Sequence, residues 1–276
     1  MCEGVNGVPL SPFHSFTPSR RHMQFTVIIP ARYASTRFPG KPLADIAGKP
    51  MVVRVAAQAA KSGAREVIVA TDHPEIARVV EAHGYEAVMT RSDHATGTDR
   101  LAEVAARRRL SAKHVVVNVQ GDEPLIAPAL IRRVAASLLA HRDAAIASAC
   151  HRITTAAEFA NPNVVKVVFD NAGYALYFSR APIPYARNAF THGITQLPPQ
   201  LRAYRHLGIY AYRCGFLSAF KKLRPAPIEQ FEALEQLRAM AYGYRICVAV
   251  TRTAPSPGVD TPEDLVRILD HYQRRR

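Results

Sequence analysis

The sequence is poor in cysteine, and no cysteine pair is spaced for a metal site. Its 276 residues contain only Cys2, Cys150, Cys214 and Cys247, with no CxxC pair. This spacing excludes the usual structural zinc sites and the dense disulfide framework of small secreted domains. We therefore expect a protein of a reducing compartment, the cytoplasm being the simplest.

Long hydrophobic runs are also missing. No apolar stretch approaches the roughly 18–20 residues that a membrane-spanning helix needs, and the longest ones have the length of a strand. With 48% hydrophobic residues the chain can still bury a substantial core. The sequence predicts a globular protein with no membrane insertion.

Acidic residues are few compared with basic ones. There are 36 Lys and Arg against 22 Asp and Glu, so the formal charge of +14 favours anionic partners such as nucleic acids, anionic membranes or phosphorylated metabolites. No zinc-finger spacing and no aromatic RNA-binding strand accompanies this charge, and the basic residues are spread along the chain. We therefore predict no nucleic-acid partner.

The first 22 residues carry Pro, Ser and Gly without periodicity and have no apolar segment long enough for a secretory signal. We predict that residues 1–22 form a disordered leader. Met23 stands two residues before the first predicted strand, which suggests the hypothesis that translation begins there. Residues 23–276 are then expected to form a single domain.

Short apolar runs alternate with helical patterns in the first half of the chain, which is typical of a mostly parallel sheet with helices on both faces. The runs are rich in Val and Ile, as in strands buried on both sides. The predicted strands are 25–29, 66–70, 86–89 and 114–119, and the predicted helices are 51–61, 74–82 and 97–109.

The rhythm changes after Asp122, where strand-like segments follow one another and predict a small antiparallel lobe. Asn171-Ala-Gly173 is a good hairpin turn, because Asn and Gly accept positive φ cheaply. The Pro-containing segment 183–201 is predicted to be a mobile excursion. The remaining predictions are a helix at 128–140, strands at 144–151, 164–169, 173–178, 206–212 and 245–250, a helix at 228–241 and a last helix from Thr261.

A basic loop directly follows the first predicted strand, at the edge where open α/β sheets bind ligands. Arginine forks match phosphate oxygens, and glycine lets backbone amides approach them. The loop is not a Walker loop, because Pro42 replaces the expected Ser or Thr. It predicts a polyphosphate site, the alternative being a solvated basic loop. Its polar residues are Arg32, Ser35, Thr36, Arg37 and Lys41, with Gly40 before the lysine.

Two aspartates are candidate ligands for a divalent cation. Asp122 follows the buried strand 114–119, where a carboxylate can hold a hard cation against substrate phosphates. Asp260, in the sequence PGVDTPED, is an equally good candidate as a ligand or as a helix cap, although Thr261 can cap that helix itself. A third segment, His94 to Arg100, has small polar residues at a helix start, suited to a base or ribose or simply to N-capping.

Several motifs together closely resemble the 3-deoxy-manno-octulosonate (Kdo) cytidylyltransferase family from Met23 to about Leu269. The motifs are RYASTR at 32–37 with PGK at 39–41, NVQGDEP at 118–124, FSR at 178–180, RHLGIY at 205–210, LEQLR at 234–238 and GVDTPED at 258–264. The resemblance implies a nucleotide-diphospho-sugar-transferase-like α/β fold. It also implies a homodimer joined through the antiparallel lobe.

The implied reaction is CTP plus Kdo giving CMP-Kdo and pyrophosphate, a step that feeds lipopolysaccharide synthesis. By similarity, the CTP phosphates contact Arg32, Ser35, Arg37 and Lys41, and the cytidine or its junction with the sugar lies near Thr96, Gly97 and Gln120. The resemblance also implies that Asp122 and Asp260 hold Mg²⁺. The implied Kdo-binding set is Arg180, His206, Tyr210, Glu235 and Gln236, together with Gln120.

The residues themselves leave alternatives for this last set. His206 in a strand is commonly a satisfied core histidine, and Arg180 can equally form a salt bridge. Glu235 and Gln236 are about 100° apart on their helix, so both can reach one ligand only if the helix end or its edge points at the pocket. Otherwise one of them is expected to contact a dimer partner or to lie behind the site.

No side chain stands out as a general base, so the mechanism expected from the resemblance relies on metal activation of the Kdo hydroxyl, with Arg32, Lys41 and Asp122 as the catalytic residues. Two other functions remain open at this point. One is activation of another sugar acid such as an acylneuraminate, and the other is a non-catalytic binder acting through a basic patch.

Overall fold

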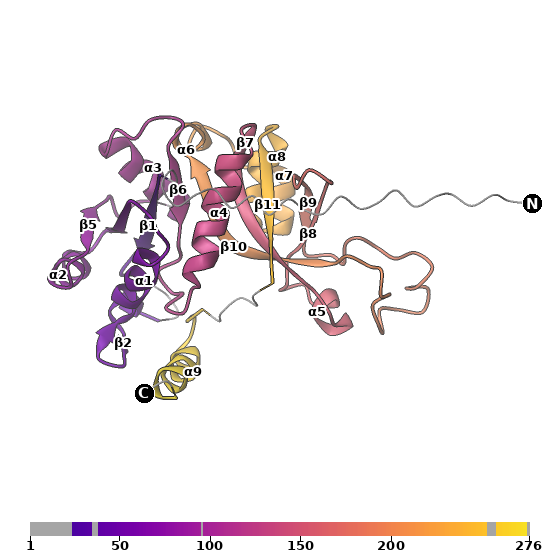
Figure 1. Ribbon diagram of the computed structural model, residues 1–276, viewed down its shortest axis with the longest axis horizontal. Coiled ribbons are helices and arrows are strands. Elements are labelled where there is room, and N and C mark those ends of the chain that lie inside the picture. The colour runs from indigo at the N-terminus through magenta and orange to yellow at the C-terminus, as the bar shows by residue number, and fades with distance from the viewer. Residues whose placement is uncertain (1–23, 35–37, 95, 253–257, 275–276) are drawn as a thin grey trace, which may run out of the picture.

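The computed structural model describes residues 24–34, 38–94, 96–252 and 258–274 (Figure 1). The predicted leader, residues 1–22, lies outside the described part of the chain. The single domain predicted for residues 23–276 stays a prediction.

A nine-stranded mixed sheet forms the centre of the molecule. Its main path runs β11-β7-β10-β6-β1-β4-β5, and β8 and β9 extend it beside β10. The strands β6, β1, β4 and β5 are parallel, whereas β10 is antiparallel to its neighbours. The strands are β1 (Phe25–Ala31), β4 (Glu66–Thr71), β5 (Glu86–Met89), β6 (Val115–Asn118), β7 (Ala144–Arg152), β8 (Lys166–Phe169), β9 (Ala175–Ser179), β10 (Tyr204–Arg213) and β11 (Arg245–Thr251).

Helices cover both faces of this sheet. One core cluster packs α1, α2 and α4 on one face, and a second packs α3, α6 and α8 on the other. Neighbouring residues of β1 serve different faces, because Val27 belongs to the first cluster and Ile28 to the second. These helices are α1 (Met51–Ala60), α2 (Pro74–Ala82), α3 (Gly97–Arg107), α4 (Pro128–Ala140), α6 (Cys214–Phe220) and α8 (Gln236–Ala241).

This architecture confirms the predicted α/β class with a mostly parallel mixed sheet. The hairpin of β8 and β9 is antiparallel, and its turn contains Gly173 at a φ of +85°. The role of this hairpin in dimerisation stays a prediction. The first half of the chain follows the predicted order of strands and helices closely, because each helix there has local start signals such as Pro74 and Pro128.

The predicted continuous helix at 228–241 is wrong. The chain instead forms α7 (Pro227–Glu232) and α8, separated by Ala233 in the left-handed conformation at a φ of +49°. The break lets Leu234 and Leu237 both enter the second core cluster. It also changes where the side chains that follow it lie.

Several short elements were not predicted from the sequence. They are the 3-10 turn η1 (Lys41–Leu43), the ribbon of β2 (Asp45–Ile46) and β3 (Lys49–Pro50), and α5 (Ala156–Ala160), together with α6. The segment 183–201 has no helix or strand and extends away from the sheet (Figure 1). It nevertheless buries Phe190 in a small cluster with Ile153 and Phe159, which the expectation of a mobile excursion did not include.

The last helix, α9 (Pro262–Gln273), begins as predicted at Thr261. Its Ile268 packs with Ile46 and Met51, which joins the end of the chain to the region after β1. Arg54 of α1 lies over the Tyr272 ring, 4.6 Å from its centroid. Among the described residues, no helix is long and apolar enough to cross a membrane.

Candidate functional site

Lys41 joins the two predicted metal-binding aspartates. Its Nζ donates to Asp122 Oδ2 at 2.6 Å and to the Val259 carbonyl at 2.9 Å, and it lies 3.7 Å from Asp260 Oδ1. Gly40, at a φ of +68°, turns the chain into η1 and so directs Lys41 towards this point. The three residues, far apart in sequence, therefore form one cluster beyond the carboxyl end of β1.

The backbone beside Asp122 is packed tightly between two other segments. A Cβ on Gly121 would lie 2.8 Å from the Pro30 carbonyl oxygen, so only glycine fits without displacing β1. On the other side, the Val259 N–H donates to the Asp122 carbonyl at 2.9 Å. These contacts fix Asp122 between the end of β1 and the segment that carries Asp260.

Neither aspartate is used as a helix cap. Helix α4 begins after Ala127, five residues beyond Asp122, and the capping box of α9 is made by Thr261 and Asp264. Burial and the neighbouring Asp122 raise the pKa of Glu123 to about 7. The carboxylate of Asp122 is half-buried and that of Asp260 is exposed, so both can meet a ligand from solvent.

The donor set at this cluster fits Mg²⁺. Two carboxylates already share one cation, the Lys41 ammonium, and hard oxygen ligands from one or two carboxylates plus substrate phosphates are the usual protein site for Mg²⁺. No group of three or more His, Cys, Asp or Glu side chains suited to a metal occurs in the described part of the chain. A metal held here would therefore take its remaining ligands from substrate and water.

The other residues of the predicted phosphate loop are less well defined. Arg32 follows β1 directly and is exposed at the same edge of the sheet. Ser35 and Arg37 lie outside the described residues. The next residue, Tyr33, donates its backbone N–H to Asp72 at 3.2 Å and stacks on the His73 ring. The loop is thus anchored to the end of β4.

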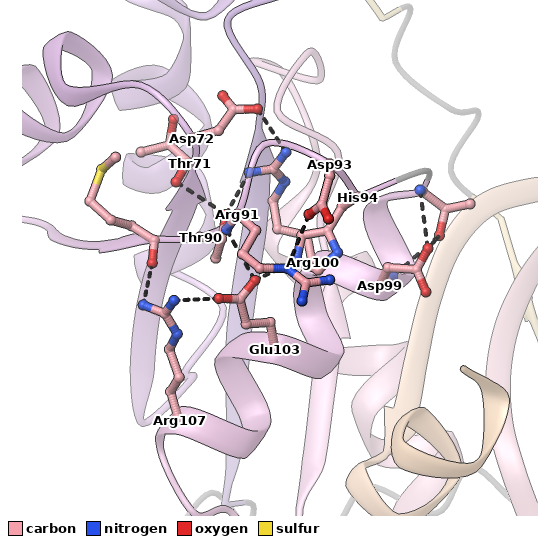
Figure 2. Close-up of polar contacts among 12 residues, drawn as sticks. Thr71, Asp72, Thr90, Arg91, Asp93, His94, Asp99, Arg100, Glu103 and Arg107 are labelled. Atoms are coloured by element: carbon pink, nitrogen blue, oxygen red, sulfur yellow. Dashed lines mark hydrogen bonds and ion pairs between the residues drawn. The ribbon is translucent and has the colours of Figure 1, made fainter. Parts of the chain in front are cut away.

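A buried ion pair holds this anchor in place (Figure 2). Arg100 of α3 donates to Asp72 at 2.9 Å and to the Thr90 hydroxyl at 2.5 Å. Thr90 in turn donates from its backbone N–H to the Thr71 carbonyl at 2.7 Å. Because Arg100 is only 3% exposed, these contacts replace its hydration. The start of α3 is therefore tied to the anchor of the phosphate loop.

The segment between β5 and α3 is held by Glu103, one turn further along α3. Its carboxylate accepts from the Arg91 backbone N–H and contacts His94 and Arg107, as Figure 2 shows. Burial acts to raise the pKa of Glu103, but these contacts outweigh it and leave the pKa lowered. Thr96 caps α3 in a capping box with Asp99, so the N-capping interpretation of this segment holds alongside any ligand role.

A small cavity with a largely apolar lining and a few polar groups lies on the face covered by α3, α6 and α8. Thr98 donates to Glu235 Oε2 at 2.7 Å across it. The other carboxylate oxygen of Glu235 and the amide nitrogen of Gln236 are buried without a hydrogen-bond partner among the described residues. Burial, the largest effect, raises the pKa of Glu235. The cavity is lined by Thr98, Ile146, Tyr210, Tyr212, Phe216, Phe220, Glu235, Gln236 and Ala239.

Glu235 and Gln236 both line the cavity, because they stand at a helix end and not within a continuous helix, which is the arrangement in which both were expected to reach one ligand. Both residues stand at the start of α8, immediately after the break at Ala233, and a helix end can direct successive side chains into one space. Buried polar atoms without partners are rare in folded proteins and commonly mark a place for a ligand or water. This cavity is thus the candidate sugar-acid site.

His206 lies on the same face of the sheet. Its Nε2 contacts the Ser148 hydroxyl at 2.8 Å, and its ring packs edge-on against Phe178. Burial lowers the pKa of His206 to about 3, so the ring is neutral at physiological pH. Tyr210 lies next to it, with the ring centroids 5.4 Å apart.

Arg180 has a different set of contacts from the cavity residues. Its guanidinium donates to the backbone carbonyls of Glu232 at 2.7 Å and Pro162 at 3.1 Å. The Glu232 carboxylate accepts from the Arg180 N–H and from Ser179. Gln120 is half-buried and lies between the end of β6 and Gly121.

Sequence reasoning missed three residues of these clusters. Thr98 lies in the His94–Arg100 segment and Val259 in the GVDTPED motif, but their contacts were not predicted, and Ser148 lies in none of the motifs. Asn118, within the NVQGDEP motif, also has a buried side-chain oxygen without a partner among the described residues. The only sequence signal that Asn118 belongs to the site was its position at the end of β6.

Residues 26–246 match the family model described as cytidylyltransferase. The chain belongs to the cytidylyltransferase family. This membership makes it a nucleotidyltransferase.

Two relatives of this cytidylyltransferase are closely similar over almost their whole length. The 3-deoxy-manno-octulosonate cytidylyltransferase of Verminephrobacter eiseniae (strain EF01-2) is 57% identical over 253 residues, covering 89% of this chain and 93% of the relative. A solved structure of a CMP:2-keto-3-deoxy-manno-octonic acid synthetase in complex with CTP has a TM-score of 0.82 and 42% identity. The match covers 92% of this chain and 99% of that one.

Proposed function

We propose that this cytidylyltransferase transfers CMP from CTP to Kdo, giving CMP-Kdo and pyrophosphate, as a step towards lipopolysaccharide. The observation that carries the proposal is the position of Lys41 between Asp122 and Asp260, at the sheet edge that also carries Arg32. A flexible cation between two carboxylates suits a site that receives a metal-bound triphosphate. The named activities of the relatives support the choice of nucleotide and sugar.

In the proposed reaction the anomeric hydroxyl oxygen of Kdo attacks the α-phosphorus of CTP. A P–O bond forms to the sugar as the bond to pyrophosphate breaks on the opposite side. Arg32, Arg37 and Lys41 offset the charge that develops on the leaving group, with Ser35 as a further phosphate contact. For Lys41 this means exchanging its present partners, Asp122 and the Val259 carbonyl, for phosphate oxygens.

Asp122 and Asp260 are the residues proposed to hold Mg²⁺. When bound there, the ion would lower the pKa of the attacking hydroxyl and offset charge on the α-phosphate. The tight packing around Gly121 and Val259 keeps the two carboxylates in a fixed relation. The chain itself thus contributes a pre-formed pair of ligands.

The cavity of Tyr210, Glu235 and Gln236 is proposed to bind the hydroxyl groups of the sugar acid, with His206 beside it. Unpartnered Oε1 of Glu235 and Nε2 of Gln236 offer one acceptor and one donor. Arg180 is proposed as the cation for the sugar carboxylate, and Gln120 as a contact at the junction with the nucleotide. Thr96 and Gly97, at the start of α3, are proposed to seat the cytidine.

We further propose a homodimer in the cytoplasm. Large apolar side chains are exposed near the β8–β9 hairpin and α7, among them Phe231 at 91% and Leu176 at 62%. Cys150, Cys214 and Cys247 are free and buried, which is consistent with a reducing compartment.

A pyrophosphate-release matrix tests the proposed function. The purified chain is assayed with each of four nucleoside triphosphates against Kdo and an acylneuraminate, with and without Mg²⁺. We expect release only with CTP, Kdo and Mg²⁺ together. Release with the neuraminate in place of Kdo would favour the alternative sugar acid. Salt-sensitive retention on DNA without any turnover would favour a non-catalytic binder.

A further inference from the structure

Ser148 occupies an unusual position between β7 and β10. The antiparallel pairing of these strands is interrupted by a bulge between Leu207 and Tyr210. At this bulge two backbone carbonyls converge on the Ser148 hydroxyl, from Leu207 at 3.1 Å and from Ile209 at 2.9 Å. The Nε2 atom of His206 is the third neighbour, at 2.8 Å.

A count of hydrogens decides the direction of the contact with His206. Carbonyl oxygens only accept, and a serine hydroxyl has a single hydrogen. The Ser148 hydrogen is therefore directed to the carbonyls of Leu207 and Ile209. The Ser148 hydroxyl can therefore only accept a hydrogen bond from the ring. His206 must be the donor, through Nε2–H.

The charge of the His206 ring determines whether its other nitrogen, Nδ1, carries a hydrogen or a lone pair. Burial keeps the His206 ring neutral, and Phe178 and Tyr210 are the aromatic groups packed around it. A neutral ring with its hydrogen on Nε2 has a lone pair on Nδ1. Among the described residues Nδ1 makes no hydrogen bond, so it is an acceptor available to a hydroxyl donor.

The His206 ring is close to the candidate sugar-acid cavity, because its centroid is 5.4 Å from that of Tyr210, which lines the cavity. Ser148 is directly opposite Tyr210 in the strand register and two residues after Ile146, and both of those residues line the cavity. We infer that Ser148 is a positioning residue, which fixes His206 in the Nε2–H tautomer so that Nδ1 accepts a hydrogen bond from a sugar hydroxyl. The inference rests on the proposed function for the sugar, whereas the tautomer itself depends only on the protein.

The first test is nuclear magnetic resonance on the protein without substrate, with ¹⁵N-labelled histidine. Long-range ¹H–¹⁵N correlations distinguish the two neutral tautomers and the imidazolium, and the His206 signals are assigned by their loss in His206→Asn. We expect the Nε2–H tautomer near pH 7 in the wild type and in Ser148→Thr, which keeps the hydroxyl. In Ser148→Ala we expect a mixture of tautomers or an exchange-broadened ring. A wild-type ring with hydrogen on Nδ1, or an unchanged ring in Ser148→Ala, would overturn the inference.

The second test is steady-state kinetics on the same variants. Loss of one positioned hydrogen bond corresponds to about a tenfold loss in kcat/KM for Kdo. We expect this loss in Ser148→Ala, with KM for CTP unchanged and partial or full recovery in Ser148→Thr. An equal loss for both substrates would mean that Ser148 only supports the fold at the bulge. If the wild type releases no pyrophosphate at all, the proposed function fails while the resonance experiment still decides the tautomer.

Discussion

At the scale of single residues, the charge balance around Lys41 is the most informative feature. Two carboxylates held close together repel one another. Lys41, with its side chain 15% exposed, lies between them and offsets this repulsion. In the protein without ligand, the Lys41 ammonium therefore stabilises the two carboxylates. In the proposed complex the same group contacts the phosphates.

Asp122→Asn is expected to lower turnover by at least about 10²-fold, because it removes a charged ligand where transition-state charge is offset. The fold should persist, since the amide keeps the shape and can still accept from Lys41. Pyrophosphate release and circular dichroism are the measurements. Asp143→Asn, at an exposed carboxylate just before β7, is the matched control. Near-normal turnover in Asp122→Asn would rule out its metal-binding role.

At the scale of elements, the break between α7 and α8 carries the sugar-acid cavity. A non-glycine residue in the left-handed region costs about 1–2 kcal/mol. That strain at Ala233 is outweighed by the burial of Leu234 and Leu237 on either side of Glu235 and Gln236. The element is thus shaped by packing and not by its own helix propensity.

Ala233→Gly is expected to raise the free energy of unfolding by about 1 kcal/mol, because glycine adopts this conformation without strain. Ala129→Gly, at an exposed helical position in α4, should instead lower it by about 1 kcal/mol. Urea denaturation of both variants measures the two shifts. A loss of stability in Ala233→Gly would show that the left-handed conformation carries no strain.

A second element-scale contact joins α4 to the β8–β9 hairpin. The ring nitrogens of His141 lie 2.8 Å from the Ser137 carbonyl and 3.1 Å from the Ala172 carbonyl, an arrangement that suits the imidazolium. The Cys247 sulfur and these two carbonyls, opposed by burial, raise the pKa of His141 to about 9. Protonation therefore stabilises the folded state.

The contribution of His141 to stability is expected to be complete below about pH 6.5 and lost as the pH rises through about 9, because the folded-state pKa is the higher one. Urea midpoints between pH 6 and 10 measure this decline in the wild type. The decline should be smaller in His141→Gln, with His83→Gln, at an exposed helix end, as the control. Parallel profiles for the wild type and His141→Gln would contradict the assignment.

Local signals explain how much of these elements could be predicted from sequence. Helices α2 and α4 were predicted to the residue, because Pro at the start and apolar periodicity act within a few residues. The meeting of Lys41 with Asp122 was expected, because parallel strands end at one edge. The break at Ala233 and the contact of Ser148 with His206 were not predictable, since both depend on packing between segments far apart in the chain.

At the scale of the whole molecule, two mostly exposed large apolar side chains belong to neighbouring elements. Phe231 and Leu176 come from α7 and β9, which Tyr177 and Glu232 join through a hydrogen bond at 3.4 Å. A surface of this kind is typical of a protein–protein interface. It is the surface that we assign to the proposed homodimer.

Sedimentation is expected to give a particle of twice the 30.4 kDa chain mass. Leu176→Asp and Phe231→Asp should each shift it towards the monomer, because a buried unpaired charge opposes association. Val266→Asp, at a 58% exposed position on α9, should leave the dimer intact. A monomer in the wild type, or equal effects of all three variants, would contradict this assignment of the interface.

The bond from Lys41 to the Val259 carbonyl spans 218 residues, so η1, in the loop after the first strand, and the segment before α9 meet at one atom. During synthesis the N-terminal half emerges from the ribosome long before residue 259. The cluster of Lys41, Asp122 and Asp260 cannot be complete while the ribosome still holds the C-terminal end. A nascent or truncated chain would therefore have the basic loop without its second carboxylate. The proposed activity would therefore appear only once the segment that carries Val259 and Asp260 has been synthesised and packed against Lys41.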